Sequence, residues 1–251
     1  GLSYREYMIM YHNIHLPLVS LSDILHNSLA ICEEVNKLCR PLEHFTHYMQ
    51  QGYYPFGAEG FATYNQRVEN TVDLLLNIEL PQLRKVDIGN IRKLKALLSV
   101  LASEVPMLVD TAKLSTLLGI SRNTLLAYLE YLDEAKLIRR LYSDDLSVKK
   151  MQKPDKILMD NCNLLKVLAL KEPNIGTLRE TFFCNQLGYQ HQVEYSKQGD
   201  FLIDHQITFE IGGQAKEGKQ VAAVENAYIV ADDIEYSYGN KLPIWLFGLL
   251  Y

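Results

Sequence analysis

Apolar and polar positions alternate with the period of an α-helix through the first third of the chain. Apolar residues return every three or four positions over 22–38 and again from 61 to about 80, as in helices with one buried face. Residues 3–6 have the Ser-x-x-Glu spacing of a capping box, which begins a helix. Pro81 is expected to end the last run. We therefore predict a helical segment over residues 1–87.

The next segment has the clearest order of elements. The hydrophobic pattern predicts helices over 91–102, 110–118 and 122–136, then strands over 137–142 and 156–159. Gly119 closes the second helix and Ser121 caps the third, which gives a helix-turn-helix. A polar loop separates the two strands and forms a wing. We predict a winged helix over residues 88–160.

Short β-prone runs dominate the last segment, residues 161–251. After a helix over 177–187, the predicted strands are 192–195, 201–203, 207–211, 227–231 and 244–247. Gly, Asp and Lys separate them. The predicted fold class is α+β, with an N-terminal helical segment, a central winged helix-turn-helix and a C-terminal small mixed sheet.

Composition is ordinary for a globular protein, with 48% hydrophobic and 22% charged residues among 251. The longest apolar run is about half of the roughly 20 residues that a membrane-spanning helix needs, and the chain does not open with a secretory signal. We expect a cytoplasmic protein that does not bind membranes. The four cysteines form no metal-binding pair, so reduced, buried thiols are expected. The pairs His12/His15 and His44/His47 lack neighbouring ligands and are expected to be ordinary polar positions.

Positive charge gathers in the middle of the chain. Residues 85–160 hold thirteen Lys and Arg against ten Asp and Glu, a balance of +3, which leaves −8 for the remainder. We therefore expect this segment to contact a polyanion, with double-stranded DNA as the partner. The candidate contacts are Arg122, Asn123 and Thr124 at the start of the recognition helix, and Arg139, Arg140, Lys149, Lys150 and Lys153 on the wing. Winged helices also dock proteins, so a protein partner is the alternative.

A phosphate-loop motif occurs in the last segment but lacks its chemistry. Residues 213–219 match G-x-x-x-x-G-K, yet position 220 is Gln where Mg²⁺ binding needs Ser or Thr. Only about a dozen residues separate Lys219 from the acidic Asp232, too few for the helix and connection that a nucleotide site needs. We do not expect nucleotide binding at this loop.

Several segments together resemble a known arrangement. They are GLSYREYM at the start, HFTHYMQQGYYP at 44–55, ISRNTLLAYLEYLDEAKLI at 120–138, DKILMDNCNLL at 155–165, GTLRETFFCNQL at 176–187 and LPIWLFGLLY at the end. In this order they resemble the C-terminal region of bacterial AAA-type ATPases that carry a domain of unknown function after the ATP-binding core. The resemblance implies that such a core precedes this region, with ATP and Mg²⁺ as its cofactors and self-association through the parent ATPase. No cofactor is expected in this chain itself.

The resemblance also implies a restriction-endonuclease-like fold for the last segment. Active members of that superfamily use two carboxylates to bind Mg²⁺ and a Glu-x-Lys lysine to activate water. The matching catalytic candidates are Glu180, Asp200, Glu210 and Lys216, with Asp200 and Glu210 as the metal ligands. Position 212, where the lysine belongs, is Gly, and Lys216 reaches the site only if its loop folds back. The favoured interpretation is a non-catalytic, degenerate nuclease-like domain; a metal-dependent nuclease is the alternative.

Overall fold

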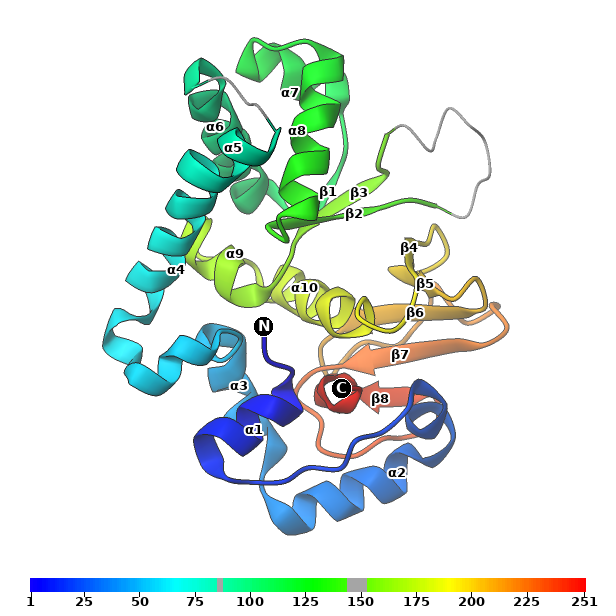
Figure 1. Cartoon of the computed structure of the whole chain (residues 1–251). Coiled ribbons are helices and arrows are strands. Elements are labelled where there is room, and N and C mark those ends of the chain that lie inside the picture. The colour runs from blue at the N-terminus through cyan, green and yellow to red at the C-terminus, as the bar shows by residue number, and fades with distance from the viewer. Residues whose placement is uncertain (85–87, 144–152) are drawn as a thin grey trace.

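Helices make up most of the first half of the chain, and the five strands β4 to β8 all lie in the last quarter (Figure 1). The structure is a computed structural model and describes residues 1–84, 88–143 and 153–251. The protein is α+β, as predicted, with an N-terminal helical part and a C-terminal mixed sheet.

The N-terminal part is a run of helices that begins where the capping box predicts. Its elements are α1 (Tyr4–His12), α2 (Leu21–Leu38), α3 (Pro41–Gln51), η1 (Pro55–Glu59), η2 (Phe61–Thr63), α4 (Tyr64–Leu74), η3 (Leu75–Glu79) and α5 (Leu80–Arg84). The Ser3 hydroxyl accepts the N–H of Glu6, and the Glu6 carboxylate accepts the N–H of Ser3, so both halves of the box are present. The prediction for this helix start is confirmed.

The expectation that Pro81 ends the helix is wrong. The chain stays helical to Arg84 because η3 is a π-helical turn, in which the N–H of Leu80 donates to the carbonyl of Leu75 five residues back. A proline inside a helix lacks an N–H and its ring clashes with the carbonyl four residues earlier. The wider π turn directly before Pro81 relieves that conflict.

The middle of the chain combines three helices with a small antiparallel sheet. The helices are α6 (Ile88–Glu104), α7 (Thr111–Leu118) and α8 (Arg122–Glu134), and the strands β1 (Met107–Leu108), β2 (Ile138–Leu141) and β3 (Lys156–Met159) are ordered β1-β3-β2. Ser121 caps α8, and Gly119 ends α7 at φ 58°, a left-handed conformation that suits glycine. The short strand β1 was not predicted. Most of the loop between β2 and β3 lies outside the described residues.

The C-terminal part is a five-stranded mixed sheet with two helices before it. They are α9 (Cys162–Leu168) and α10 (Ile175–Leu187), and the strands are β4 (Val193–Tyr195), β5 (Phe201–Ile203), β6 (Ile207–Gly212), β7 (Ala227–Ala231) and β8 (Lys241–Pro243). The strand order is β4-β5-β6-β7-β8. Strands β4 to β6 pair antiparallel, whereas β6, β7 and β8 pair parallel. The predicted mixed sheet is confirmed.

The strand predicted at 244–247 is wrong. This stretch belongs to η4 (Ile244–Leu249), a 3₁₀ helix whose six residues are all buried. A short apolar run with no polar positions does not distinguish a strand from a buried helical turn. Here the run packs against α1, α2 and α10, which cover it on several sides, and the edge strand β8 comes just before it.

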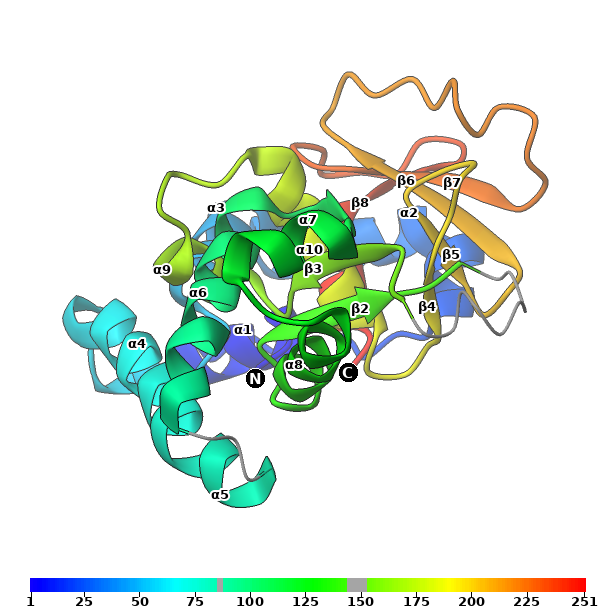
Figure 2. The same cartoon turned by 90° about the horizontal axis from the view of Figure 1, so that it is seen from above.

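A shared core of buried side chains joins the parts, whose arrangement in space is shown in Figures 1 and 2. Helix α10 lies between the β2–β3 sheet and the five-stranded sheet, and the N–H of Tyr195 donates to the carbonyl of Tyr142 across the two sheets at 2.9 Å. The two chain ends meet, because the hydroxyl of Ser3 donates to the carbonyl of Tyr251 at 2.7 Å. None of the described helices has the length and apolar character needed to cross a membrane.

Candidate metal-binding and catalytic site

Two predicted carboxylates lie side by side where strands β5 and β6 meet. Asp200 directly precedes β5, and it bonds to the backbone on both sides of Glu210. Its N–H donates to the carbonyl of Phe209 at 2.9 Å, and its Oδ2 accepts the N–H of Ile211 at 2.6 Å. The antiparallel pairing of two adjacent strands therefore fixes the relative position of the two acids.

Glu210 is a buried carboxylate with an unused oxygen. Its side chain is 1% exposed, its Oε1 lies 2.8 Å from the Nζ of Lys216, and its Oε2 has no hydrogen-bond partner. A buried carboxylate oxygen without a partner is costly. A bound cation is one partner that would satisfy such an atom.

Lys216 lies over Gly212, the position at which the resemblance implies a lysine. A Cβ on Gly212 would lie 2.7–2.8 Å from the Cβ, Cγ and Cδ of Lys216, so the Lys216 stem covers the face on which a side chain at position 212 would stand. A turn in which the N–H of Lys216 donates to the carbonyl of Gly213 at 3.0 Å brings the stem back. Glycine at 212 leaves room for a lysine supplied from four residues further on.

Glu180 approaches the same site from helix α10. Its Oε2 lies 2.5 Å from the Nζ of Lys156, the first residue of β3, and it interacts electrostatically with Asp200 and Lys216. Burial raises the pKa of Glu180 above its ordinary value, and Lys156 opposes that rise. Glu180 therefore lies within electrostatic range of Asp200 and Lys216, and Glu210 joins this group through its ion pair with Lys216. The group includes a second lysine, Lys156, that the sequence analysis did not single out.

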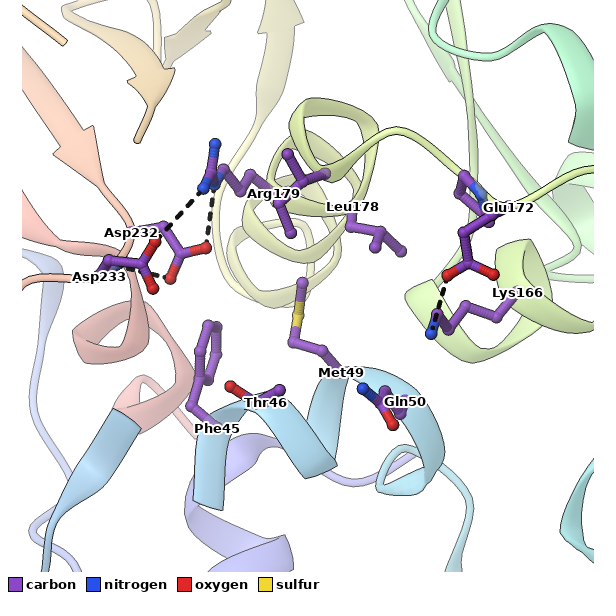
Figure 3. A pocket seen from close by; sticks show the side chains of 12 residues that line it. Phe45, Thr46, Met49, Gln50, Lys166, Glu172, Leu178, Arg179, Asp232 and Asp233 are labelled. Atoms are coloured by element: carbon purple, nitrogen blue, oxygen red, sulfur yellow. Dashed lines mark hydrogen bonds and ion pairs between the residues drawn. The ribbon is translucent and has the colours of Figure 1, made fainter. Parts of the chain in front are cut away.

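A neighbouring ion pair, Arg179–Asp232, lies between α10 and the end of β7. Arg179 Nε lies 2.9 Å from Asp232 Oδ2, and the N–H of Asp232 donates to the carbonyl of Gly212 at 3.0 Å. The pair ties α10 to the ends of β6 and β7. It also borders a cavity of about 360 Å³ between α3, α9 and α10, shown in Figure 3, whose apolar wall includes Phe45 and Met49.

The donor set fits Mg²⁺ better than Zn²⁺. Across the part of the chain that the structure describes, no three His, Cys, Asp or Glu side chains are grouped to hold a metal ion by themselves. Structural and catalytic zinc sites need at least three such ligands. Mg²⁺ keeps several waters and is usually bound by one or two carboxylates plus substrate phosphate. Asp200 and Glu210, with the unpartnered Oε2, fit that second pattern.

The predicted nucleic-acid contacts divide into two groups. Arg122 and Asn123 are exposed at the first turn of α8, as expected. Thr124 is half-buried and takes part in the helix cap, with its N–H donating to the Ser121 hydroxyl at 3.1 Å. Lys153 is partly exposed after the wing. Lys149 and Lys150 lie outside the described residues.

The two predicted wing arginines lie in strand β2, not in the loop. Arg139 is 15% exposed and points inward, with its Nε 3.0 Å from the buried Asp160 and its guanidinium over the ring of Tyr189. We therefore remove Arg139 from the nucleic-acid surface, because its charge is already compensated in the interior. Arg140 pairs with Asp133 at 3.0 Å and is partly exposed.

The cysteines, the histidine pairs and the phosphate-loop motif lie in surroundings that indicate structural roles. Three of the four cysteines, Cys32, Cys162 and Cys184, are free and buried, as predicted. His12 and His47 both contact the Tyr7 hydroxyl, at 3.1 and 2.8 Å, so one histidine of each predicted pair lies against the same tyrosine. Residues 219–226, all described, form turns where a phosphate loop requires a helix.

Sequence reasoning missed Lys156 and the Arg179–Asp232 pair. The signal for Lys156 was a cation at the head of the apolar run Lys156–Met159, all of which is buried. A lysine is rarely buried without a partner, so a carboxylate facing it was to be expected. Nothing in the order of residues indicated that this carboxylate is Glu180.

Comparison with known proteins gives a family and a distant relative. A family described as a domain of unknown function, DUF8612, matches residues 42–174, which is just over half of the chain. The uncharacterized protein MJ1637 of Methanocaldococcus jannaschii is 24% identical over 278 aligned positions, which cover 99% of this chain. The chain spans only 58% of that relative's length. No solved structure matches the chain.

Proposed function

This chain belongs to the DUF8612 family, and from its site we propose that it is a metal-dependent nuclease that hydrolyses phosphodiester bonds with Glu180, Asp200, Glu210 and Lys216. One observation carries the proposal: Lys216 lies over Gly212 with its Nζ 2.8 Å from Glu210. The interpretation as an inactive shell depended on the absence of a lysine at this point. The folded-back loop supplies one.

Each side chain has a separate task in this proposal. Asp200 and Glu210 would hold a Mg²⁺ ion, which would neutralise charge on the phosphate when bound. Lys216 donates to the charge that develops on the phosphate oxygens as water attacks. Glu180 orients the attacking water and accepts its proton, while the bond to the leaving sugar oxygen breaks and that oxygen takes a proton from solvent.

Cleavage assays test the proposal directly. The purified chain is incubated with Mg²⁺ or Mn²⁺ and with duplex DNA, single-stranded DNA and RNA, and products are followed on denaturing gels. We expect cleavage that EDTA abolishes and that Asp200→Asn and Glu210→Gln remove. Absence of products from every substrate with either metal would refute the nuclease proposal and leave the inactive shell.

Moving the lysine is the sharper test. Lys216→Ala should lower the cleavage rate by about 10²–10³-fold, the usual cost of one charge-stabilising donor. Gly212→Lys in a Lys216→Gly background should restore activity, since it places the ammonium at the end of β6. Glycine at 216 removes the Cβ that would lie 2.7 Å from the new side chain. Lys219→Ala is the matched control, because Lys219 is 86% exposed and pairs with Glu217 in the same loop. Equal losses in the control would show that the loop, not the Lys216 ammonium, matters.

The arrangement of α6, α7, α8 and the β1–β3 sheet supports a winged helix as the substrate-binding part. Exposed Arg122 and Asn123 lie at the start of α8, the helix that follows the turn and would be the recognition helix. Part of the negative charge further along α8 is compensated, since Asp133 pairs with Arg140 and Glu134 with Arg84, while Glu130 is exposed. Duplex DNA affinity should fall with salt, and Arg122→Ala should reduce both the affinity and the salt slope, the latter by about one. A fluorescence anisotropy titration at several salt concentrations measures this, and unchanged binding would remove Arg122 from the interface.

The ATP-binding core implied by the resemblance is a separate proposal about sequence beyond these residues. It would supply ATP hydrolysis and self-association to a longer protein, and a matching phosphate loop upstream would support it. The nuclease proposal does not depend on it.

A further inference from the structure

Lys156 belongs to the three-stranded sheet but contacts the site of the five-stranded one. It is the first residue of β3 and pairs in register with Leu141 of β2. Its Nζ lies 2.5 Å from Glu180 Oε2 and 5.0 Å from the ring centroid of Phe201, the residue after Asp200. The side chain therefore spans from one sheet to the other.

The burial of this lysine shows that it acts through Glu180. Its side chain is 9% exposed, and that of Glu180 is 17% exposed. The Nζ lies against the Glu180 carboxylate and the Phe201 ring, and so little of the side chain is exposed that a nucleic-acid phosphate has poor access to it. Removing two charges from water costs several kcal/mol per ion, and a hydrophobic pair would often be as stable. A buried pair at the edge of a cluster of acids is better explained by the orientation it imposes on the carboxylate.

We propose that Lys156 is a positioning residue of the hydrolysis, which fixes the Glu180 carboxylate so that it faces the attacking water. The inference rests on the proposed nuclease function. Because Lys156 comes from β3, the site is complete only when the three-stranded sheet is seated against α10. The strand that leaves the wing therefore contributes directly to the site.

A double-mutant cycle tests whether Lys156 works through Glu180. The variants are Lys156→Met, Glu180→Gln and the double variant, with duplex DNA, Mn²⁺ and measured kcat and KM. Lys156→Met should lower kcat by about 10–100-fold with KM unchanged. In the Glu180→Gln background the same change should cause no further loss. Lys156→Arg should recover part of kcat because it keeps the charge.

Two controls keep the outcome clear. Lys166→Met breaks a Lys–Glu pair with Glu172 away from the site and should leave kcat unchanged. The double variant removes both buried charges, so it should fold, by circular dichroism, even where Lys156→Met does not. Additive losses in the cycle, or a change in KM alone, would overturn the positioning role. A wild-type protein that fails to cleave would overturn the nuclease proposal and this inference together, whereas cleavage with additive losses overturns the inference only.

Discussion

At the scale of single residues, the two acids at the β5–β6 junction form a candidate cation site. Stability measurements can detect the binding of a cation there. Asp200 and Glu210 are held together by strand pairing, and Glu210 Oε2 is buried without a partner. Lys216 compensates one oxygen of Glu210, and a divalent ion would compensate the like charge that remains on the two acids. The folded protein should therefore bind a divalent ion that the unfolded chain does not.

Thermal unfolding with and without Mn²⁺ measures this binding independently of cleavage. At 100 times its Kd, an ion that binds only the folded state stabilises it by about 2.7 kcal/mol, which raises Tm by roughly 5–10 °C for a chain of this size. Asp200→Asn should abolish the shift, and it keeps an oxygen for the N–H of Ile211. Glu217→Gln, an exposed change in the nearby loop, should preserve the shift. A shift that survives Asp200→Asn would place the ion elsewhere.

The sequence was enough to name the two acids and Lys216 as candidates, but not to predict whether Lys216 reaches the acids. Asp200 and Glu210 stand at the ends of β-prone runs, and strand pairing brings such ends together. The position of Lys216 depends on how residues 213–216 turn back, which is set by tertiary contacts and by the space over Gly212. Lys156 depends on contact between two sheets, which no local pattern encodes.

At the scale of elements, local signals predicted the helices with caps and failed where burial decided the conformation. Ser3 and Ser121 fix the starts of α1 and α8 through hydrogen bonds within four residues, so sequence is enough. Pro81 and the run 244–249 behave differently because a π turn and close packing override the local preference.

The Ser121 cap links the stability of α8 to its proposed contact with DNA. Its hydroxyl accepts the N–H of Thr124 at 3.1 Å, next to the exposed Arg122. Ser121→Ala should cost about 1 kcal/mol of unfolding free energy and also weaken DNA binding, because the first turn of α8 frays. Ser20→Ala, which removes the corresponding cap of α2, should cost about the same stability with DNA affinity unchanged. Urea denaturation and anisotropy measure the two quantities; equal affinity losses in both variants would contradict a local role for α8.

At the scale of the whole molecule, buried polar groups join the helical part, the small sheet and α10. Asp160, which follows β3, is 2% exposed and pairs with Arg139 of β2 at 3.0 Å. It also accepts from the hydroxyl of Tyr53 at 3.3 Å and from the amide of Asn185 on α10 at 3.4 Å. These contacts lie within one continuous core. The three predicted segments therefore share one interior. The proposed site is linked to the small sheet of this interior through Lys156.

Two Arg–Asp pairs with the same Nε–oxygen distance test how much the buried Arg139–Asp160 pair stabilises the fold. Arg139–Asp160 and Arg140–Asp133 both join Nε to a carboxylate oxygen at 3.0 Å, but Asp160 is buried and Asp133 is 28% exposed. Asp160→Asn leaves the Arg139 charge buried without a counter-ion and should cost about 3–5 kcal/mol. Asp133→Asn leaves Arg140 partly solvated and should cost less than about 1 kcal/mol. Because the core is continuous, Asp160→Asn should shift one cooperative transition, followed by both circular dichroism and Trp245 fluorescence. Two separated transitions would instead mean that the segments unfold independently and that the junction does not couple them.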